Sequence, residues 1–151
     1  MNVGDICVRD TVTIRPFDEL AAAARLMRDQ HVGYLVVVEP AAQEGAFKPA
    51  GVLTDRDIVV SVVAKDSDAN FLRTGDVMTR DPVVAQEDES LGSALKKMRQ
   101  VGVRRLPVVG DYGQLVGVLA LDDIIDALVG ELEDVAGAVR TEQMLEHTLR
   151  P

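Results

Sequence analysis

Runs of branched apolar residues alternate along this chain with segments in which apolar residues recur every three or four positions. Val32 to Val38 is such a run, and its composition is typical of a buried strand. The spacing of Leu20, Ala23 and Met27 before it is that of one face of a helix. The pattern predicts five elements in the first half: a strand at 11–14, a helix from about 20 to 28, strands at 32–38 and 51–53, and a helix at 55–65.

The second half of the chain repeats this order. GDICVRDTVT at residues 4–13 returns as GDVMTRDPVV at 75–84, and apolar runs return at 103–109 and 117–119 before a helix at 122–129. A duplication of this length makes two copies of one folding unit, related by approximate two-fold symmetry, with a cleft between them. Because each copy alone buries little apolar surface, we expect the two copies to share one core.

Two places distinguish the copies. Copy one has a long connection at 39–49, which we expect to be a mobile surface loop, where copy two has the tight turn 110–113. Pro107 stands where copy one has Val36, and a proline at this position predicts a strand end or an edge strand.

The patterns divide the chain into repeat 1 (1–66), a polar linker (67–74), repeat 2 (75–130) and an acidic tail (131–151). Apolar residues of the tail recur at near-helical spacing, although Gly137 weakens such a helix by up to about 1 kcal/mol relative to alanine. The apolar face of this amphipathic helix either packs on its own domain or helps to bury the interface of a homodimer.

Composition and charge limit the cellular compartment and the classes of partner that we expect. Of the residues, 47% are apolar, and no run approaches the roughly 18 apolar residues of a membrane helix, so we expect a globular protein without membrane contact. The first residues show no basic region followed by an apolar run, so we expect no secretory signal and a cytoplasmic location. Cys7 stands alone, which fits a reducing compartment, and as the counterpart of Met78 it is expected to be a small apolar filler. The net charge of −9 and the scarcity of aromatic residues disfavour nucleic acid as a partner.

Three short motifs carry a resemblance to a known family. They are VMT at 77–79, LPVV at 106–109 and Gly-Val-Leu-Thr-x-x-Asp at 51–57. With both copies in the right order and at the right spacing, the chain resembles a tandem pair of cystathionine-β-synthase (CBS) domains over about residues 3–130. The resemblance implies an α/β (α+β) fold of two βαββα repeats packed through their sheets with pseudo-two-fold symmetry, plus a C-terminal helix. It also implies dimerisation, and sensing of adenine nucleotides or S-adenosylmethionine on behalf of a partner enzyme or channel.

The segment 51–57 ends a strand and starts a helix, whose free N–H groups and partial positive charge suit phosphate. A hydroxyl at Thr54 can donate to a phosphate oxygen, and a carboxylate at Asp57 can accept from both hydroxyls of a ribose. The resemblance implies these two roles for Thr54 and Asp57. The alternative is that Thr-x-x-Asp is a helix capping box that binds no ligand.

Basic side chains complete the expected site. The resemblance implies that Arg104 and Arg105 face phosphates held by the other repeat, and guanidinium groups hold phosphate bidentately. One of the two can point to water, since neighbours on a strand alternate faces. Arg56 either joins them or stays solvated on its helix. In repeat 2 Asp123 keeps the ribose-type acid but Ala120 lacks the hydroxyl, so this second site is expected to bind phosphate weakly, to stay empty or to favour a nucleoside.

The leading hypothesis is a cytoplasmic regulatory or sensor module that binds AMP, ADP or ATP between its repeats. It would form a homodimer and signal to a protein that the sequence does not identify. An S-adenosylmethionine binder and a dimeric interaction scaffold with a vestigial cleft are the alternatives. No base, nucleophile or oxyanion arrangement accompanies the paired aspartates, so an enzyme with a catalytic cofactor is not expected. His31 and His147 lie far apart without a cluster at metal-ligand spacing, so no structural zinc is expected, and His31 is expected at a surface turn.

Overall fold

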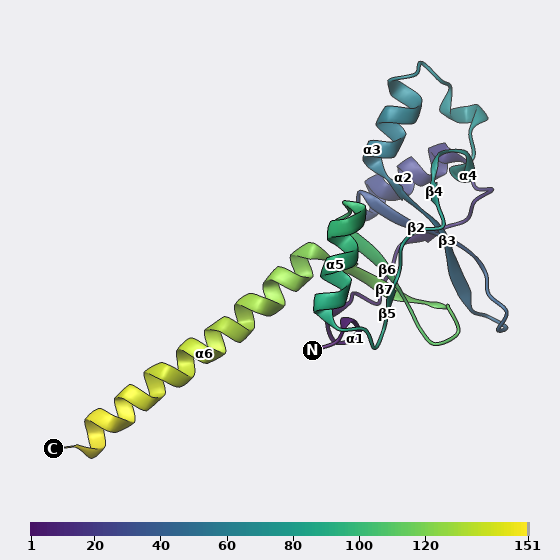
Figure 1. Cartoon of the computed structure of the whole chain (residues 1–151). Coiled ribbons are helices and arrows are strands. Elements are labelled where there is room, and N and C mark those ends of the chain that lie inside the picture. The colour runs from purple at the N-terminus through teal and green to yellow at the C-terminus, as the bar shows by residue number, and fades with distance from the viewer. Residues whose placement is uncertain (151) are drawn as a thin grey trace.

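The computed structural model describes residues 1–150 and contains two small sheets, helices around them and one long helix that leaves the body (Figure 1). The helices are α1 (Val3–Ile6), α2 (Leu20–Gln30), α3 (Asp55–Ile58), α4 (Thr74–Val77), α5 (Leu91–Val101) and α6 (Leu121–Leu149), with a π-helical segment η1 (Val59–Val63) and a 3-10 turn η2 (Ala69–Phe71). The strands are β1 (Thr13–Ile14), β2 (Tyr34–Pro40), β3 (Phe47–Thr54), β4 (Thr79–Arg80), β5 (Ala85–Gln86), β6 (Arg105–Val109) and β7 (Leu115–Ala120).

The two sheets follow the duplicated order that the sequence predicts. The first has the strand order β1-β2-β3-β4 and the second β5-β6-β7. In each repeat a short first strand pairs in parallel with the second, which forms an antiparallel hairpin with the third. Both hairpins carry a register shift, after Val37 in one and after Val108 in the other. The βαββα order of both repeats is therefore confirmed.

The expectation of one shared core is wrong, because the buried residues form two clusters. One cluster lies in repeat 1 and includes Leu35 and Leu53; the other lies in repeat 2 and includes Leu106 and Leu119. Each cluster is completed by a segment from the other repeat. Val3 of α1 is fully buried in the repeat 2 cluster, whereas Met78, Val77 and the neighbouring α4 pack on repeat 1.

Backbone hydrogen bonds fix this exchange of segments. The N–H groups of Val3 and Gly4 donate to the carbonyls of Glu89 and Glu87, both over 2.8 Å. At the equivalent place in the other copy, the Gly75 N–H donates to the Pro16 carbonyl over 2.7 Å. A Cβ atom at Gly4 would come within 2.6 Å of the Glu87 side chain, so the duplicated Gly-Asp motif requires glycine for this close approach. Cys7 packs on the repeat 2 cluster as the expected apolar filler, and burial raises the pKa of its thiol.

Pro107 lies inside β6, the central strand of its sheet, so the expected strand end or edge position is wrong. Its counterpart Val36 donates its N–H to the Val12 carbonyl over 3.3 Å. Pro107 has no N–H to donate, and the parallel ladder with β5 begins only at the next residue, Val108. The proline is tolerated because no backbone hydrogen bond to β5 is needed at its position. In repeat 1 the hairpin extends to Pro40 and Phe47, so the connecting loop is shorter than the expected 39–49.

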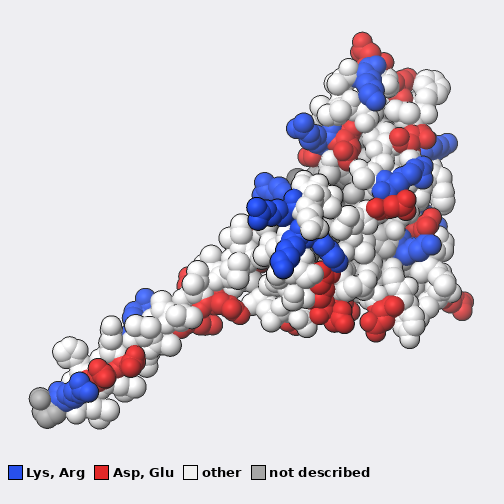
Figure 2. Space-filling model, viewed as in Figure 1, with Lys and Arg blue, Asp and Glu red and all other residues white. Residues whose placement is uncertain are grey.

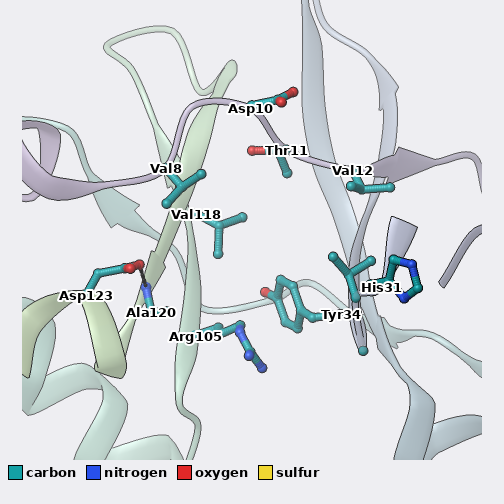
Figure 3. A pocket seen from close by; sticks show the side chains of 12 residues that line it. Val8, Asp10, Thr11, Val12, His31, Tyr34, Arg105, Val118, Ala120 and Asp123 are labelled. Carbon is teal, nitrogen blue, oxygen red and sulfur yellow. Dashed lines mark hydrogen bonds between the residues drawn. The ribbon is translucent and has the colours of Figure 1, made fainter. Parts of the chain in front are cut away.

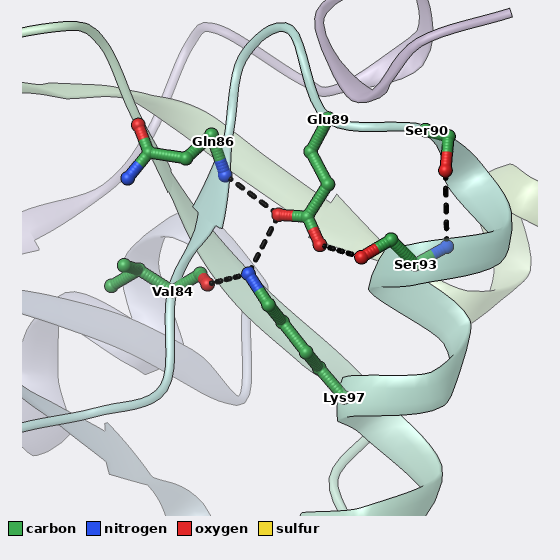
Figure 4. Close-up of polar contacts among 6 residues, drawn as sticks. All are labelled: Val84, Gln86, Glu89, Ser90, Ser93 and Lys97. Atoms are coloured by element: carbon green, nitrogen blue, oxygen red, sulfur yellow. Dashed lines mark hydrogen bonds and ion pairs between the residues drawn. The ribbon is translucent and has the colours of Figure 1, made fainter.

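A partly buried polar network ties the start of α5 to β5 (Figure 4). The Glu89 carboxylate accepts hydrogen bonds from Lys97 Nζ (2.7 Å), Ser93 Oγ (2.6 Å) and the Gln86 N–H (3.0 Å). Lys97 Nζ also donates to the Val84 carbonyl over 3.0 Å. Burial raises the pKa of Glu89, but its three hydrogen bonds and the charge of Lys97 outweigh burial and hold the pKa below its usual value.

The second helix of repeat 2 and the tail form one continuous helix, α6, which runs from Leu121 to Leu149. Beyond its buried Ile124 the helix projects away from both repeats (Figure 1). Its apolar side chains are therefore exposed; Leu132 is 68% exposed and Val135 is 62% exposed. The alternative in which the tail packs on its own domain is wrong for these residues. Charged groups of both signs are interspersed on the body. Along the projecting part of α6, called the rod below, uncharged stretches separate the charged groups (Figure 2).

Candidate functional site

A pocket of about 280 Å³ opens between the two repeats (Figure 3). Repeat 1 contributes the segment before β1 and the turn between α2 and β2, and repeat 2 contributes β6, β7 and the start of α6. The volume is close to the lower end, roughly 300 Å³, of the range for small-molecule sites. The lining residues are Val8, Asp10, Thr11, Val12, His31, Val32, Gly33, Tyr34, Arg105, Val118, Ala120 and Asp123.

The exchanged N-terminal segment builds one wall of this pocket. Val8 exchanges both backbone hydrogen bonds with Val118 of β7, each over 2.9 Å, and this pairing holds the following residues 10–12 over the pocket. The opposite wall follows from the end of α2, where His31 adopts a left-handed conformation (φ 54°) and turns the chain into β2. His31 is exposed at a turn, as expected, and it lines the pocket as well.

Two buried hydroxyls in the pocket lining have no hydrogen-bond partner among the described residues. They are Thr11 Oγ1 and the phenol oxygen of Tyr34. Burial raises the pKa of Tyr34, and the positive charge of Arg105 opposes this effect only partly, so the phenol stays protonated and is a hydrogen-bond donor. Leaving a buried hydroxyl unpaired costs about 1–3 kcal/mol. Both groups are therefore poised to bind a polar ligand atom.

Charged groups flank these hydroxyls. The Asp123 carboxylate accepts a hydrogen bond from the Ala120 N–H over 3.2 Å through one oxygen, Oδ2. The guanidinium of Arg105 lies 5.6 Å from the centre of the Tyr34 ring, within cation–π distance. Asp10 adds a second carboxylate, and valine side chains supply apolar walls, so the pocket combines apolar surface with few polar groups, as ligand sites usually do.

The structure brings together two of the six predicted site residues, Arg105 and Asp123, in this pocket. Thr54 and Asp57 instead form a reciprocal capping box: Thr54 Oγ1 accepts from the Asp57 N–H (3.1 Å), and Asp57 Oδ2 accepts from the Thr54 N–H (2.9 Å). Arg56 is exposed on α3. The side chains of Thr54, Arg56 and Asp57 do not line the pocket. That phosphate binds at Thr54 more strongly than at the second site stays a prediction.

Arg104 is the sixth predicted residue, and it also lies outside the pocket. Its guanidinium forms an ion pair with Asp122 over 3.1 Å, and both side chains are exposed. Arg104 and Arg105 thus separate, one to the solvent and one to the pocket, as neighbours on a strand do.

Sequence reasoning missed Thr11, Tyr34 and Asp10. A signal for Tyr34 exists, since the duplication places it opposite Arg105, the very position at which a ligand contact was predicted in the other copy. Symmetry alone therefore nominates Tyr34 for the second site. Thr11 begins the segment predicted as a strand, but its local pattern gives no sign of a ligand contact, and only the exchange between repeats brings Thr11 and Asp10 to the pocket.

Within residues 1–150, no helix is both long enough and apolar enough to cross a membrane. The same range holds no group of three or more His, Cys, Asp or Glu side chains placed to bind a metal ion.

Comparison with known proteins identifies the family. The sequence model of the CBS domain matches residues 3–64 and 75–130. The CBS domain-containing protein YhcV of Bacillus subtilis is 36% identical over 123 residues, which cover 82% of each chain. The uncharacterized protein MK0525 of Methanopyrus kandleri is 31% identical over 137 residues, which cover 89% of this chain and 67% of that protein. Among solved structures, the CBS domain pair of protein MJ0100 in complex with 5′-methylthioadenosine and S-adenosylmethionine is similar, with a TM-score of 0.72 and 26% identity over 87% of this chain and 98% of that chain. Two matched repeats, two exchanged segments and a pocket between them agree: this chain belongs to the CBS domain family and is a tandem CBS pair.

Proposed function

We propose that this protein is a regulatory module that binds the adenosine part of a nucleotide or of S-adenosylmethionine in the pocket between its repeats. The observation that carries the proposal is the pair of buried, unpartnered hydroxyls of Thr11 and Tyr34, which line a pocket together with Asp123. The similar CBS pair of MJ0100 was solved with two adenosine derivatives, which supports this ligand class. The module would act in the cytoplasm, as a homodimer, on a partner protein, and it would not be an enzyme.

Each lining group has a role in this proposal. The free oxygen of Asp123 accepts from the ribose hydroxyls, as acidic residues do in dinucleotide-binding folds. Val12 and Val118 enclose the base, and Tyr34 donates to a polar atom of the ligand. Arg105 is the cation nearest to an attached phosphate or carboxylate.

The balance of charge separates the candidate ligands. Asp10 and Asp123 oppose a single guanidinium in the pocket, and Ala120 offers no hydroxyl to a phosphate. AMP, with one phosphate, and S-adenosylmethionine, with a positive sulfonium, suit this balance better than ATP. The predicted second site, with Thr54, Asp57 and the nearby arginines, is the one suited to a longer phosphate chain.

Calorimetry with AMP, ADP, ATP and S-adenosylmethionine tests the proposal. We expect at least one of them to bind below millimolar concentration, and Asp123→Asn to weaken that binding about tenfold or more, because hydrogen bonds to charged groups contribute about 1.5–3 kcal/mol. Asp57→Asn is the matched control in the other repeat and leaves this pocket unchanged. If only Asp57→Asn weakens binding, the ligand occupies the Thr54 site. If none of the four binds, the ligand class is wrong.

Tyr34→Phe supplies a second readout in the same protein. Removing the unpaired hydroxyl raises the melting temperature of the unliganded protein, since it removes a buried polar group without a partner. The same change weakens ligand binding, because the donor is gone. A variant that binds ligand as tightly as the parent would show that Tyr34 makes no contact to the ligand.

A dimeric scaffold without ligand is the second candidate. It is favoured by the internal use of polar groups at the predicted first site, where Thr54 and Asp57 bond to each other's backbone and Arg104 pairs with Asp122. The scaffold predicts no change of melting temperature with nucleotides. A ligand at about 100 times its dissociation constant stabilises the folded state by about 2.7 kcal/mol, which a thermal scan detects.

A further inference from the structure

The apolar residues of α6 follow a heptad pattern where the helix leaves the body. Steps of four and three residues alternate, an average of 3.5, and this period is that of a two-stranded coiled coil rather than of a helix packed on a globular core. The seam consists of Leu121, Ile125, Leu128, Leu132, Val135 and Val139. The run covers nearly three heptads without a polar interruption.

Beyond Leu121, which packs on the repeat 2 cluster, the seam has no cover within residues 1–150. Ile125, Leu128 and Val139 are each about half exposed, and Leu132 and Val135 are more than 60% exposed. Beyond its first turns, which contact α1 and β7, α6 stands clear of both sheets and of the other helices (Figure 1). An apolar stripe of this length on a projecting helix marks an interaction surface.

Charge placement indicates a second copy of the chain in parallel orientation. Asp126, Glu133 and Asp134 occupy heptad positions away from the seam, so the acidic groups of two paired helices stay in solvent. Glu131 flanks the seam near its middle. In a parallel pair it faces the small Ala136 of the other helix, whereas an antiparallel pair would bring the two Glu131 side chains together.

The size of the seam sets the expected strength. Its side chains offer on the order of 600 Å² per helix, against about 800 Å² per partner in a typical stable interface. The pairing is therefore expected to be a reversible dimer, measurable at micromolar concentrations.

We propose that α6 pairs in parallel and in register with α6 of a second copy through the seam defined above. Because α6 starts at Ala120 and Asp123 of the pocket, the paired rod connects the two pockets of a dimer rigidly. This inference specifies the homodimer of the proposed function, but it does not depend on ligand binding.

Disulfide trapping tests register and orientation in the full chain. In a Cys7→Ser background, Val135→Cys and Val139→Cys are each expected to give a disulfide-linked dimer under mild oxidation, since a parallel pair brings identical seam residues together. Glu133→Cys, on the outward face, is the matched control and is expected to give much less. Equal trapping in the control, or trapping in none of the three, overturns the proposal. Efficient trapping only in a mixture of Ile125→Cys and Val135→Cys would mean antiparallel pairing and would overturn it as well.

Sedimentation equilibrium supplies the second measurement. Leu132→Glu places a charge in the exposed seam without touching either core, and it is expected to weaken self-association at least tenfold while the melting temperature of the diluted protein stays unchanged. Gly137→Ala, on the outward face, strengthens the helix and is expected to retain or tighten the dimer. Unchanged association of Leu132→Glu would show that another surface holds the copies together. Nucleotide calorimetry on Leu132→Glu keeps this result separate from the proposed ligand.

Discussion

Equivalent buried positions of the two repeats can hold side chains that differ in polarity. Val3 and Thr74 occupy the same place in the duplicated motif, and both are fully buried in the core of the opposite repeat. The valine fills its site with apolar atoms. The threonine brings a hydroxyl, Thr74 Oγ1, which finds no partner among the described residues.

Thr74→Val is therefore expected to stabilise the protein by about 1 kcal/mol or more, because it removes an unpaired buried hydroxyl and keeps the shape of the side chain. Urea denaturation of both proteins measures the change in the free energy of unfolding. Thr79→Val, at an exposed position of β4, is the control and is expected to change stability by less than about 0.5 kcal/mol. A destabilised Thr74→Val would mean that the hydroxyl has a partner, such as a bound water.

At this scale the sequence predicted some site residues and missed others for a physical reason. The motif around Asp123 lies at a strand-to-helix junction, which periodicity locates well. Thr11 has no such context, since its side chain reaches the pocket only through the pairing of Val8 with Val118. Long-range pairing of an irregular segment leaves no trace in local spacing.

Elements are the scale at which the two repeats differ most in chemistry. In repeat 2 the Glu89–Lys97 network fastens α5 to β5, while the residues of repeat 1 equivalent to Ser93 and Lys97 are Ala22 and Leu26. Of this network, repeat 1 keeps only the hydrogen bond that the Arg15 N–H donates to Asp18 Oδ2 over 2.9 Å, and it lacks the serine and the lysine. The repeats are expected to respond differently to acid.

The lowered pKa of Glu89 determines how the stability of repeat 2 changes with pH. The unfolded chain, with a Glu pKa near 4.5, binds the proton more tightly than the folded protein does. The network thus contributes stability above about pH 4.5, and this contribution is lost as the pH falls through the lower folded-state pKa. Glu89→Gln is expected to be about 1–3 kcal/mol less stable at pH 7 and to lose less stability on acidification.

Urea midpoints at neutral pH and at several values below pH 4.5 measure both effects. Glu133→Gln, an exposed side chain on α6, is the control and is expected to follow the pH dependence of the parent protein. Parallel pH curves for Glu89→Gln and the parent would show that Glu89 is not the group responsible.

Element boundaries illustrate what hydrophobic spacing can and cannot predict. It located α2, α5 and both hairpins, because each presents a regular apolar face to its own core. It separated the tail from the second helix of repeat 2 near residue 130, although the helix continues through Gly130 and Gly137. A glycine lowers helix propensity but does not stop a helix that has good neighbours on both sides.

The whole molecule is defined by the exchange of segments between repeats. Each core is incomplete without a piece from the other half of the chain, so the repeats are one cooperative unit even though their cores are separate. A substitution near residue 3 is consequently expected to destabilise repeat 2, which is distant in sequence.

Val3→Ala is expected to cost about 1–3 kcal/mol, since it leaves a void in a fully buried site. Hydrogen exchange monitored by mass spectrometry should increase first in α5 and β6 of repeat 2, rather than in the neighbouring α2 and β2 of repeat 1. Leu149→Ala, at an exposed site on α6, is a control expected to leave both repeats unchanged. Faster exchange confined to repeat 1 would contradict the exchanged packing.

The exchange of segments also affects how this protein can fold during its synthesis on the ribosome. The first helical turn emerges long before its docking place in repeat 2 has been synthesised, and repeat 1 waits for Thr74 to Met78 before its own interior can close. During that interval the nascent chain holds apolar side chains in water, where chaperones bind and neighbouring nascent chains can exchange the same segment. We therefore expect slow translation of the second half to raise the share of molecules that exchange a segment with another chain instead of closing on themselves.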